Sequence, residues 1–390
     1  MEKILVVTRS FDQQIGGMET HTLLIVKHFL ARGYSVTVVT PHIHDGNAPL
    51  FTLKGLIIKR ISSPPNDLLK YSLKFLVAIR NFIERHGYEY EHIISVSMAA
   101  GFVTRRLTNK KNIQITTVLH GTYHLEQQSL ISQFFNTRNK NIKTLLGIPY
   151  CAIMKILQWN IVVCSSKIIS ASTIITKDLN KCYDKKYTNN ITTVKNFINE
   201  KHFGFIERFN RSRTELKLLY AGRLHKEKGI DMIIKLVGFL EHLNIPYHLD
   251  IVGDGAMLKQ VETSFKDNQK VNLVGKVSNK KVAIYLKEAD IFLFPTKITG
   301  EGMSLSLLEA MSTGMIVITS DIPSMIELLD DKKDGLLFKL GDQKDFNNKV
   351  LWCIKNIDQL KNISHIARKK IVTDHSLLKG LNIIEKAITE

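Results

Sequence analysis

Short apolar runs rich in β-branched residues alternate with longer segments of helical period along the whole chain. In the first half we predict strands at 4–8, 35–40, 57–61, 92–96 and 114–119, with helices at 18–31, 67–86 and 99–108. The first of these helices is expected to end at Gly33, a residue suited to a helix C-cap. Alternation of strand and helix predicts right-handed βαβ units, and therefore a parallel sheet.

The same alternation restarts in the second half of the chain. There the predicted strands are 216–221, 247–252, 271–274, 291–294, 315–319 and 335–338. A helix is expected at 230–243, and the last 30 or so residues are helical in pattern without a further strand. These patterns predict an α/β protein of two doubly wound, Rossmann-like domains with a junction near residue 195.

Composition narrows the class of protein. The 390 residues are 44 % hydrophobic and 23 % charged, which is ordinary for a globular chain with one or two buried cores. The four cysteines form no Cys-x-x-Cys pair, which argues against a disulfide scaffold or a Cys-ligated zinc site and fits a reducing compartment. No stretch of about 18 uninterrupted apolar residues is present, so we expect a soluble or peripheral protein.

The net charge of +18 is distributed unevenly. Residues 1–195 hold 25 Lys and Arg against 11 Asp and Glu, a net of +14, whereas residues 196–390 hold 29 against 25. An anionic partner of the first half would explain this bias: nucleic acid, anionic lipid or a phosphorylated substrate. The alternative is a basic surface that serves only solubility. The basic residues we single out are Arg105, Arg106, Lys110, Lys111, Arg138, Lys140 and Lys143.

One segment, 141–163, has the pattern of an amphipathic helix that carries Trp159. A basic amphipathic helix with tryptophan can lie in a membrane interface, but the same pattern suits a helix packed on the first sheet. Both readings stay open. We expect the sequence Gly147-Ile-Pro149 to break the helix.

Two strand-to-helix turns carry residues suited to phosphate binding. Before the first helix stands Gly16-Gly17, which permits close approach of a ligand to backbone N–H groups. After the strand at 216–221 the sequence reads Gly222-Arg-Leu-His-Lys-Glu-Lys-Gly229. Ligands of open α/β sheets bind at this edge, and the two cations Arg223 and Lys228 there suit a diphosphate.

The most informative stretch runs from Gly300 to Ala310. Glu301 is expected in the loop after the strand at 291–294, and Gly302-Met303-Ser304 is expected to start a helix whose N–H groups can bind phosphate or sugar oxygens. Glu309 lies two helical turns further on among apolar neighbours, where a carboxylate needs a partner. Two neighbouring ribose hydroxyls would supply that partner.

Together these motifs resemble the retaining glycosyltransferases of family 4, of the type that assembles bacterial surface polysaccharides. The resemblance covers essentially the whole chain and rests on the order of its parts. Along the chain these are Gly-Gly-x-Glu19, His120-Gly121, Val194-Lys-Asn196, Gly-Arg-Leu-x-x-x-Lys-Gly229, Gly253-Asp-Gly255 and Glu301-x7-Glu309. It implies the GT-B fold, in which two Rossmann-like domains face each other across a cleft. The domains would be 1–195 and 196–372, with a C-terminal helix at about 373–390 that crosses back onto the first domain.

The resemblance also implies roles for individual residues. Arg223 and Lys228 would stabilise the diphosphate, Glu301 would contact the donor sugar, and His120 would line the sugar pocket. The remaining donor-binding positions would be Gly17, Gly222, Gly302, Met303, Ser304 and Glu309, the last on the ribose. Two departures from the family pattern leave the donor preference open. Ser304 stands where Gly or Pro is frequent, and Lys195-Asn196-Phe197 replaces the commoner Pro-Asn-Gly.

The activity implied is metal-independent transfer of a sugar, with retention, from a UDP- or GDP-sugar to a saccharide acceptor. We expect no cofactor and no metal, because an Asp-x-Asp motif is missing; His42-Ile-His44-Asp45 and the pair His120 and His124 are weak metal candidates. The basic first half predicts a lipid-linked acceptor and a cytoplasmic, peripheral position on the inner face of the cell membrane. That position fits assembly of capsule, O-antigen or lipopolysaccharide core. The alternatives are a sugar-nucleotide epimerase, a phosphorylase on the same fold, or a basic nucleic-acid-binding protein, the last without a supporting motif.

Overall fold

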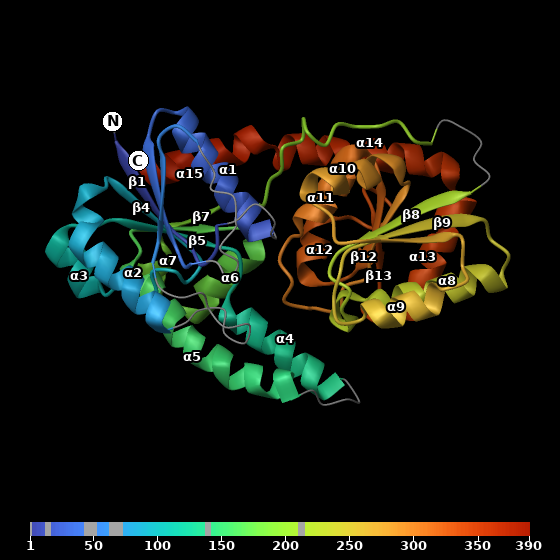
Figure 1. Ribbon diagram of the computed structural model, residues 1–390, viewed down its shortest axis with the longest axis horizontal. Coiled ribbons are helices and arrows are strands. Elements are labelled where there is room, and N and C mark those ends of the chain that lie inside the picture. The colour runs from blue at the N-terminus through green and yellow to red at the C-terminus, as the bar shows by residue number, and fades with distance from the viewer. Residues whose placement is uncertain (1, 12–16, 43–52, 62–72, 137–141, 210–214) are drawn as a thin grey trace. The chain divides into compact units, whose positions relative to one another are not determined.

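A computed structural model of the chain describes residues 2–11, 17–42, 53–61, 73–136, 142–209 and 215–390. The chain forms two compact units (Figure 1). The first consists of Met1–Lys195 together with Leu378–Glu390, and the second of Asn196–Leu377. Each is an α/β unit built on a parallel sheet, as predicted, and each is described here by itself.

The first unit contains a seven-stranded sheet in the order β3-β2-β1-β4-β5-β6-β7. Its strands are β1 (Lys3–Val7), β2 (Ser35–Thr40), β3 (Leu56–Arg60), β4 (His92–Val96), β5 (Ile115–Leu119), β6 (Lys167–Ser170) and β7 (Ile191–Thr193). Its helices are α1 (Gly17–Ala31), α2 (Leu73–His86), α3 (Arg105–Lys111), α4 (Tyr123–Asn136), α5 (Ile142–Cys164), α6 (Thr173–Cys182), α7 (Lys185–Thr188) and α15 (Leu377–Thr389). Because helices cover both faces, the central strands are buried along nearly their whole length rather than at alternate positions.

Several predictions for this unit were wrong in detail. The helix expected at 99–108 is a turn followed by α3, which starts at Arg105 after the N-cap residue Thr104. Pro149 does not end its helix: α5 runs through it, packed along α4, and Gln127 Nε2 donates to the Ile148 carbonyl at 3.1 Å. The strands β6 and β7 were missed because they are short and hold only two and one aliphatic residues, whereas the equally short β11 and β13 are apolar throughout. Of the helix expected at 67–86, residues 67–72 lie outside the described part.

The second unit repeats the topology with six parallel strands in the order β10-β9-β8-β11-β12-β13. Its strands are β8 (Leu216–Ala221), β9 (Tyr247–Val252), β10 (Val271–Gly275), β11 (Ile291–Phe294), β12 (Ile316–Ser320) and β13 (Leu336–Phe338). Its helices are α8 (Ile230–His242), α9 (Leu258–Phe265), α10 (Asn279–Glu288), α11 (Leu305–Thr313), α12 (Pro323–Leu328), α13 (Gln343–Lys355) and α14 (Ile357–Asp374). All six predicted strands of this half are present.

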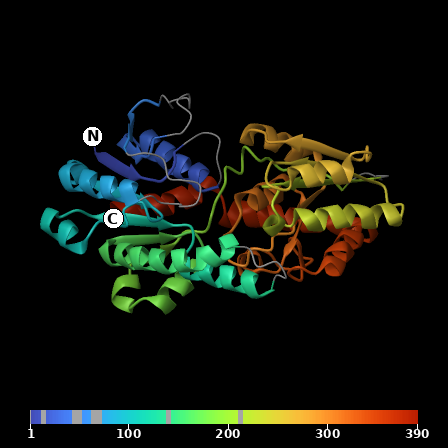
Figure 2. The same cartoon turned by 60° about the horizontal axis from the view of Figure 1, so that its bottom comes forward.

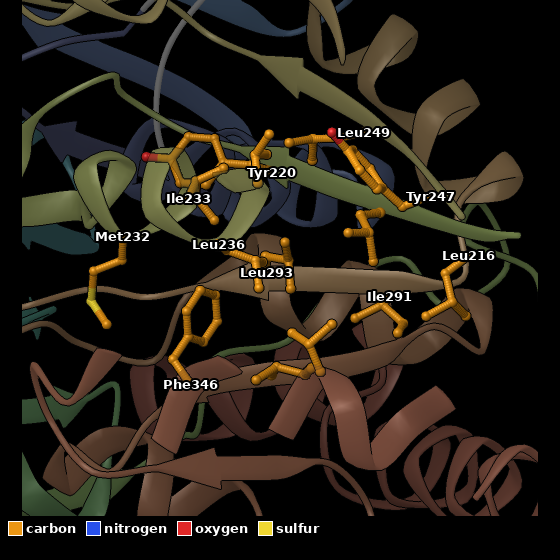
Figure 3. Close-up of a cluster of buried hydrophobic side chains, with 14 of the residues drawn as sticks. Leu216, Tyr220, Met232, Ile233, Leu236, Tyr247, Leu249, Ile291, Leu293 and Phe346 are labelled. Atoms are coloured by element: carbon orange, nitrogen blue, oxygen red, sulfur yellow. The ribbon is translucent and has the colours of Figure 1, made fainter. Parts of the chain in front are cut away.

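Alternate side chains of its strands feed two separate cores. Leu218 and Tyr220 join the core formed with α8 and α13, whereas Leu219 between them joins the core formed with α10 and α11. Figure 3 shows the first of these cores, where Leu293 and Phe346 meet side chains from β8 and α8. Alternate side chains of the central strands are buried on opposite faces of the sheet, which fixes these strands in place. The loops at their carboxyl ends therefore begin from fixed positions.

The C-terminal segment returns to the first unit at Leu378. The helix α14 ends at Asp374, and His375 Nδ1 pairs with the Asn196 carbonyl oxygen at 2.7 Å within the second unit. In α15, Glu385 lies 2.9 Å from His28 and 3.2 Å from Arg32 of the first unit. These ion pairs tie α15 to α1, so the residues beyond 377 belong structurally to the N-terminal sheet.

One helical window in the described residues, Gly147–Cys164 of α5, is long and apolar enough to cross a membrane by length and composition. One third of it is buried inside the first unit, and a core helix of a soluble protein can meet the same criterion. The helix packs along α4 and also contacts α3 and α7 (Figure 2, where this part of the chain comes forward).

Candidate functional site

The candidate site of the second unit lies at the point where its strand order reverses. The first strand of this unit, β8, pairs with β9 on one side and with β11 on the other, so the chain leaves the carboxyl ends of β8 and β11 in opposite directions. Gly222 follows β8, and the loop from Pro295 to Ser304 follows β11. Both sequence motifs of the second half therefore meet at one edge of the sheet, where open α/β sheets bind ligands.

Two glycines allow the loops at this edge to lie directly against one another. At Gly229 the backbone has φ +77°, and a Cβ there would lie 1.9 Å from the Pro295 carbonyl oxygen. At Gly253, with φ +143°, a Cβ would lie 1.9 Å from the Gly222 carbonyl oxygen. Any side chain at either position would push the loops apart. Gly229 thus lets the β8 and β11 loops meet, and Gly253 lets the β9 loop lie against the β8 loop.

The lysine and the glutamate singled out from the sequence form an ion pair here. The Lys228 ammonium donates to Glu301 Oε1, and the side chains are only 17 % and 14 % exposed. The other carboxylate oxygen of Glu301 accepts from the hydroxyl of Thr296, which is buried. Ser324 Oγ donates to the Glu301 carbonyl oxygen at 2.6 Å. Glu301 is therefore held at both ends. The Lys228 ammonium has three N–H donors, so it can keep this carboxylate and still donate to an anion.

Arg223 is placed differently from Lys228. Its side chain is exposed, and its carbonyl oxygen accepts a hydrogen bond from the Tyr220 hydroxyl at 2.9 Å. Burial raises the pKa of that tyrosine, so the hydroxyl stays a donor. The tyrosine fixes the backbone of Arg223 and leaves the guanidinium at the surface of the same loop.

The predicted helix start at Gly302-Met303-Ser304 was wrong by one turn: α11 begins at Leu305, with Ser304 as its N-cap residue. The Ser304 hydroxyl bonds to Ser306 Oγ at 2.8 Å instead of capping the helix, so it leaves the first-turn N–H groups without a side-chain acceptor. Asn196 Nδ2 donates to the Met303 carbonyl oxygen at 2.7 Å and fixes the loop before the helix. Amides of this kind at a helix start can bind an anion or a sugar oxygen.

Glu309 lies in the middle of α11, between the buried residues Leu308 and Ala310. No described residue donates a hydrogen bond to its carboxylate or forms an ion pair with it. Burial raises the pKa of this carboxyl to about 8. The described residues therefore supply no hydrogen-bond donor to the Glu309 carboxylate. A ligand with two adjacent hydroxyls would supply such donors.

The first unit places His120 directly after β5, where its ring meets His21 of α1. His120 Nε2 lies 3.1 Å from His21 Nδ1, and the rings are edge to face with centroids 4.9 Å apart. Burial, and then Arg9, lowers the pKa of His120 to about 4; burial, and then His120, lowers that of His21. Both rings are therefore neutral near pH 7. His120 Nδ1 is buried, and no described residue hydrogen bonds to it.

The remaining sequence candidate of this unit, Gly17, is exposed as the first residue of α1, and Gly16 lies outside the described part. His21 and Thr296 were not found by sequence reasoning. The only signal for His21 was its place on the buried face of the first helix, and Thr296 carried none.

One group of side chains in the described residues could hold a metal ion: His124, Asp178 and Cys182, with ligand atoms within 4.8 Å of one another. His124 Nδ1 lies 2.6 Å from Asp178, which also accepts from the hydroxyl of Thr122 at the start of α4. The carboxylate is thus satisfied by the protein. The other metal candidate from the sequence falls largely outside the described residues, since it includes His44 and Asp45.

Two family models match this chain in succession. Residues 15–201 match the model described as Glycosyltransferase Family 4, and residues 204–370 match Glycosyl transferases group 1. The chain is a family-4 glycosyltransferase. Membership in this family confirms the resemblance and favours sugar transfer over the epimerase, phosphorylase and nucleic-acid-binding alternatives.

Known relatives of this glycosyltransferase agree in fold. Sucrose-phosphate synthase from Thermosynechococcus elongatus superposes with a TM-score of 0.79 at 17 % identity, covering 99 % of this chain and 98 % of the other. The Anabaena protein HepE, solved with UDP-glucose, gives 0.70 at 16 % identity over 99 % of both chains. An Escherichia coli UDP-Gal:α-D-GlcNAc-diphosphoundecaprenol α-1,3-galactosyltransferase is 32 % identical over 35 % of each chain. The predicted GT-B fold is thereby confirmed.

Proposed function

We propose that this glycosyltransferase moves a sugar from a UDP-sugar to a lipid-linked saccharide, with retention of configuration and without a metal ion. The observation that carries the proposal is the carboxyl end of the second sheet. Lys228 and Glu301 come from two loops that meet at Gly229, and α11, which follows the second loop, carries Glu309. Cations for a diphosphate, a carboxylate for a sugar and a carboxylate for a ribose are the groups that such a donor requires.

In this proposal the donor is bound from its ribose to its sugar along one edge. The Glu309 carboxylate accepts hydrogen bonds from the two ribose hydroxyls, and Arg223 and Lys228 bind the diphosphate. The Glu301 carboxylate accepts hydrogen bonds from hydroxyls of the sugar. The backbone of Gly222, Gly302, Met303 and Ser304 supplies N–H groups. A uridine donor is supported by HepE, which binds UDP-glucose, and by the galactosyltransferase, whose donor is UDP-galactose. The roles of Gly17 and His120 of the first unit stay predictions from the family resemblance.

The chemical step needs charge stabilisation above all. The bond between the anomeric carbon and the diphosphate oxygen breaks, and the acceptor oxygen attacks the same face of the anomeric carbon. The leaving phosphate accepts the proton of the acceptor hydroxyl, and the nucleoside diphosphate departs. Lys228 and Arg223 stabilise the negative charge that grows on the leaving group. In this proposal the two cations take the place of a metal ion.

The acceptor and the location follow from charge and from the relative. The galactosyltransferase acts on a GlcNAc-diphosphoundecaprenol, an anionic lipid-linked saccharide. The first half of this chain carries a net charge of +14, which suits such an acceptor at an anionic membrane surface. We place the enzyme in the cytoplasm, peripheral on the inner face of the membrane, in cell-surface polysaccharide biosynthesis.

The experiment is a donor screen followed by product analysis. UDP-glucose, UDP-galactose, UDP-N-acetylglucosamine and GDP-mannose are tested for thermal stabilisation, and the best donor is incubated with GlcNAc-diphosphoundecaprenol and excess EDTA. The expected result is stabilisation by a uridine donor and an α-linked product from an α-linked donor by NMR coupling. Inversion, loss of activity in EDTA, or conversion of the donor without acceptor would each refute a part of the proposal.

A further inference from the structure

The outer face of α5 carries three large apolar side chains in one line. Ile153, Ile156 and Trp159 are 62 %, 68 % and 50 % exposed, and we call them the α5 stripe. Their spacing of three residues puts them on one side of the helix. The opposite side, with Met154 and Ile161, is buried in the first unit. The helix therefore has a second apolar face that this unit leaves in solvent.

Such a cluster differs from the isolated apolar residues common on protein surfaces. Elsewhere Ile284 and Ile326 are 52 % and 55 % exposed on the separate helices α10 and α12. Single residues of that kind need no explanation, whereas a contiguous stripe marks a surface that another phase or molecule covers. The exposed residues Pro149 and Ala152 extend the stripe by one turn without adding a charge.

The charges around α5 indicate what covers the stripe. Residues 98–195, which include α3 to α7, hold 14 Lys and Arg but only three Asp and Glu. The helices α3 and α7 both contact α5. They carry the exposed cations Arg105, Arg106, Lys111, Lys185 and Lys186. Of the three acids, Asp178 is buried and Asp184 is paired with Lys186.

We propose that the α5 stripe inserts into the interfacial layer of an anionic lipid bilayer, with the cations of α3 and α7 at the headgroups. The proposal rests on the proposed peripheral location, and it adds an apolar anchor to the electrostatic attraction. A tryptophan beside isoleucines, flanked by Lys and Arg, is the composition of a helix that lies in this layer. Two combined signals make the association stable where either alone is weak.

The apolar anchor makes a prediction that pure electrostatics does not. Salt screens the cations, since the Debye length falls to a few ångströms near 1 M, but it does not weaken burial of isoleucine and tryptophan. Binding to anionic vesicles should therefore fall with salt to a residual level and not to zero. Replacing the isoleucines should abolish the salt-resistant binding and leave the salt-sensitive binding.

The experiment uses the full chain, in which the two tryptophans are Trp159 and Trp352. With Trp352→Phe, emission reports Trp159 alone. The probes are vesicles of phosphatidylglycerol and phosphatidylcholine, vesicles of phosphatidylcholine only, and anionic vesicles with brominated acyl chains. The test variant is Ile153→Ser with Ile156→Ser. The matched control is Ile284→Ser with Ile326→Ser, which removes two isoleucines of the second unit that are also more than half exposed.

We expect a blue shift of Trp159 emission on anionic vesicles, quenching by the brominated chains, and a partition coefficient roughly tenfold or more lower for the test variant than for the control. Binding without blue shift or quenching would overturn the insertion. So would equal partition of the test and control variants. Concentration-dependent self-association that the test variant loses would assign the stripe to a second copy of the chain instead.

Stabilisation by UDP is measured in parallel for every variant. Retained stabilisation shows that the test variant is folded. If the chain with an intact stripe binds UDP but does not insert into anionic vesicles, only the anchor is refuted and the proposed function stands. If the double variant does not fold, quenching of Trp159 in the otherwise intact stripe still decides the question.

Discussion

Replacing Glu309 with glutamine is expected to stabilise the protein progressively as the pH rises from 5.5 to 8. Burial raises the pKa of this carboxyl to about 8 in the folded state, from a reference value of 4.5. The folded state therefore holds the proton more tightly than the unfolded chain. The resulting stability is fully present below pH 4.5 and is lost as the pH rises toward 8. Glutamine does not titrate, so the variant does not suffer this loss.

The size of the effect follows from the shift. At about 1.4 kcal/mol per pKa unit, the carboxylate costs about 4 kcal/mol of folding free energy at pH 8 relative to strongly acidic pH. About 3 kcal/mol of that cost falls between pH 5.5 and 8, a range in which the difference between two variants can be measured. Glu309 is only half-buried, and the solvent contact of its carboxylate lowers both figures because solvation favours the charged form.

The assay is urea unfolding of the wild type and Glu309→Gln at pH 5.5, 6.75 and 8. The exposed residue Glu262 supplies the matched control, Glu262→Gln, which should track the wild type at every pH. The free-energy difference between Glu309→Gln and the wild type should grow with pH by about 3 kcal/mol. A difference that is constant from pH 5.5 to 8 would refute the raised pKa, whatever the role of Glu309 in donor binding.

The same titration links Glu309 to the donor. If ribose hydroxyls bind the ionised carboxylate, then UDP binding expels a proton and UDP affinity rises with pH, by up to roughly tenfold per unit below pH 8. The variant Glu309→Gln lacks this dependence, and comparing it with the wild type cancels the titration of the UDP phosphate itself. Isothermal titration in buffers of different ionisation enthalpy counts the released proton directly. Equal pH profiles for both proteins would remove Glu309 from the ribose site.

Four further substitutions test the carboxyl end of the second sheet. Lys228→Ala and Arg223→Ala should each lower kcat by roughly 10²-fold, as loss of a charge-stabilising donor does, and near-normal turnover would show them to be surface charges. Thr296→Val should weaken sugar transfer more than UDP binding, because it frees Glu301 but touches no nucleotide group; parallel losses would contradict that position. Gly229→Ala should lower the melting temperature and abolish UDP stabilisation, since a Cβ there meets the Pro295 carbonyl oxygen; an unchanged melting temperature would show that the two loops can separate.

The fold could be predicted from the sequence because buried parallel strands are marked by composition. Strand segments such as Ile4–Val7 or Ile291–Phe294 are apolar throughout, since both of their faces are covered. The edge strand Ile191–Thr193 is short and only half-buried, and it carries no such mark. The continuation of α5 through Pro149 also lay beyond the local pattern, because packing along α4 outweighs the missing hydrogen bond.

The candidate site was predictable where a loop needs a particular backbone and unpredictable where one side chain meets another. Gly229 and Gly253 are visible in the sequence because positive φ and close approach leave only glycine. The threonine that holds Glu301 could be a serine, an asparagine or a backbone amide, so Thr296 leaves no trace in a single sequence. The same reasoning applies to the α5 stripe. Helical period shows that α5 has two apolar arcs, but only the positions of α4 and of the first sheet decide which arc is covered. Residues that a particular backbone geometry requires can therefore be predicted from the sequence. Residues that are required by contact with another side chain can be identified only when the position of that side chain is known.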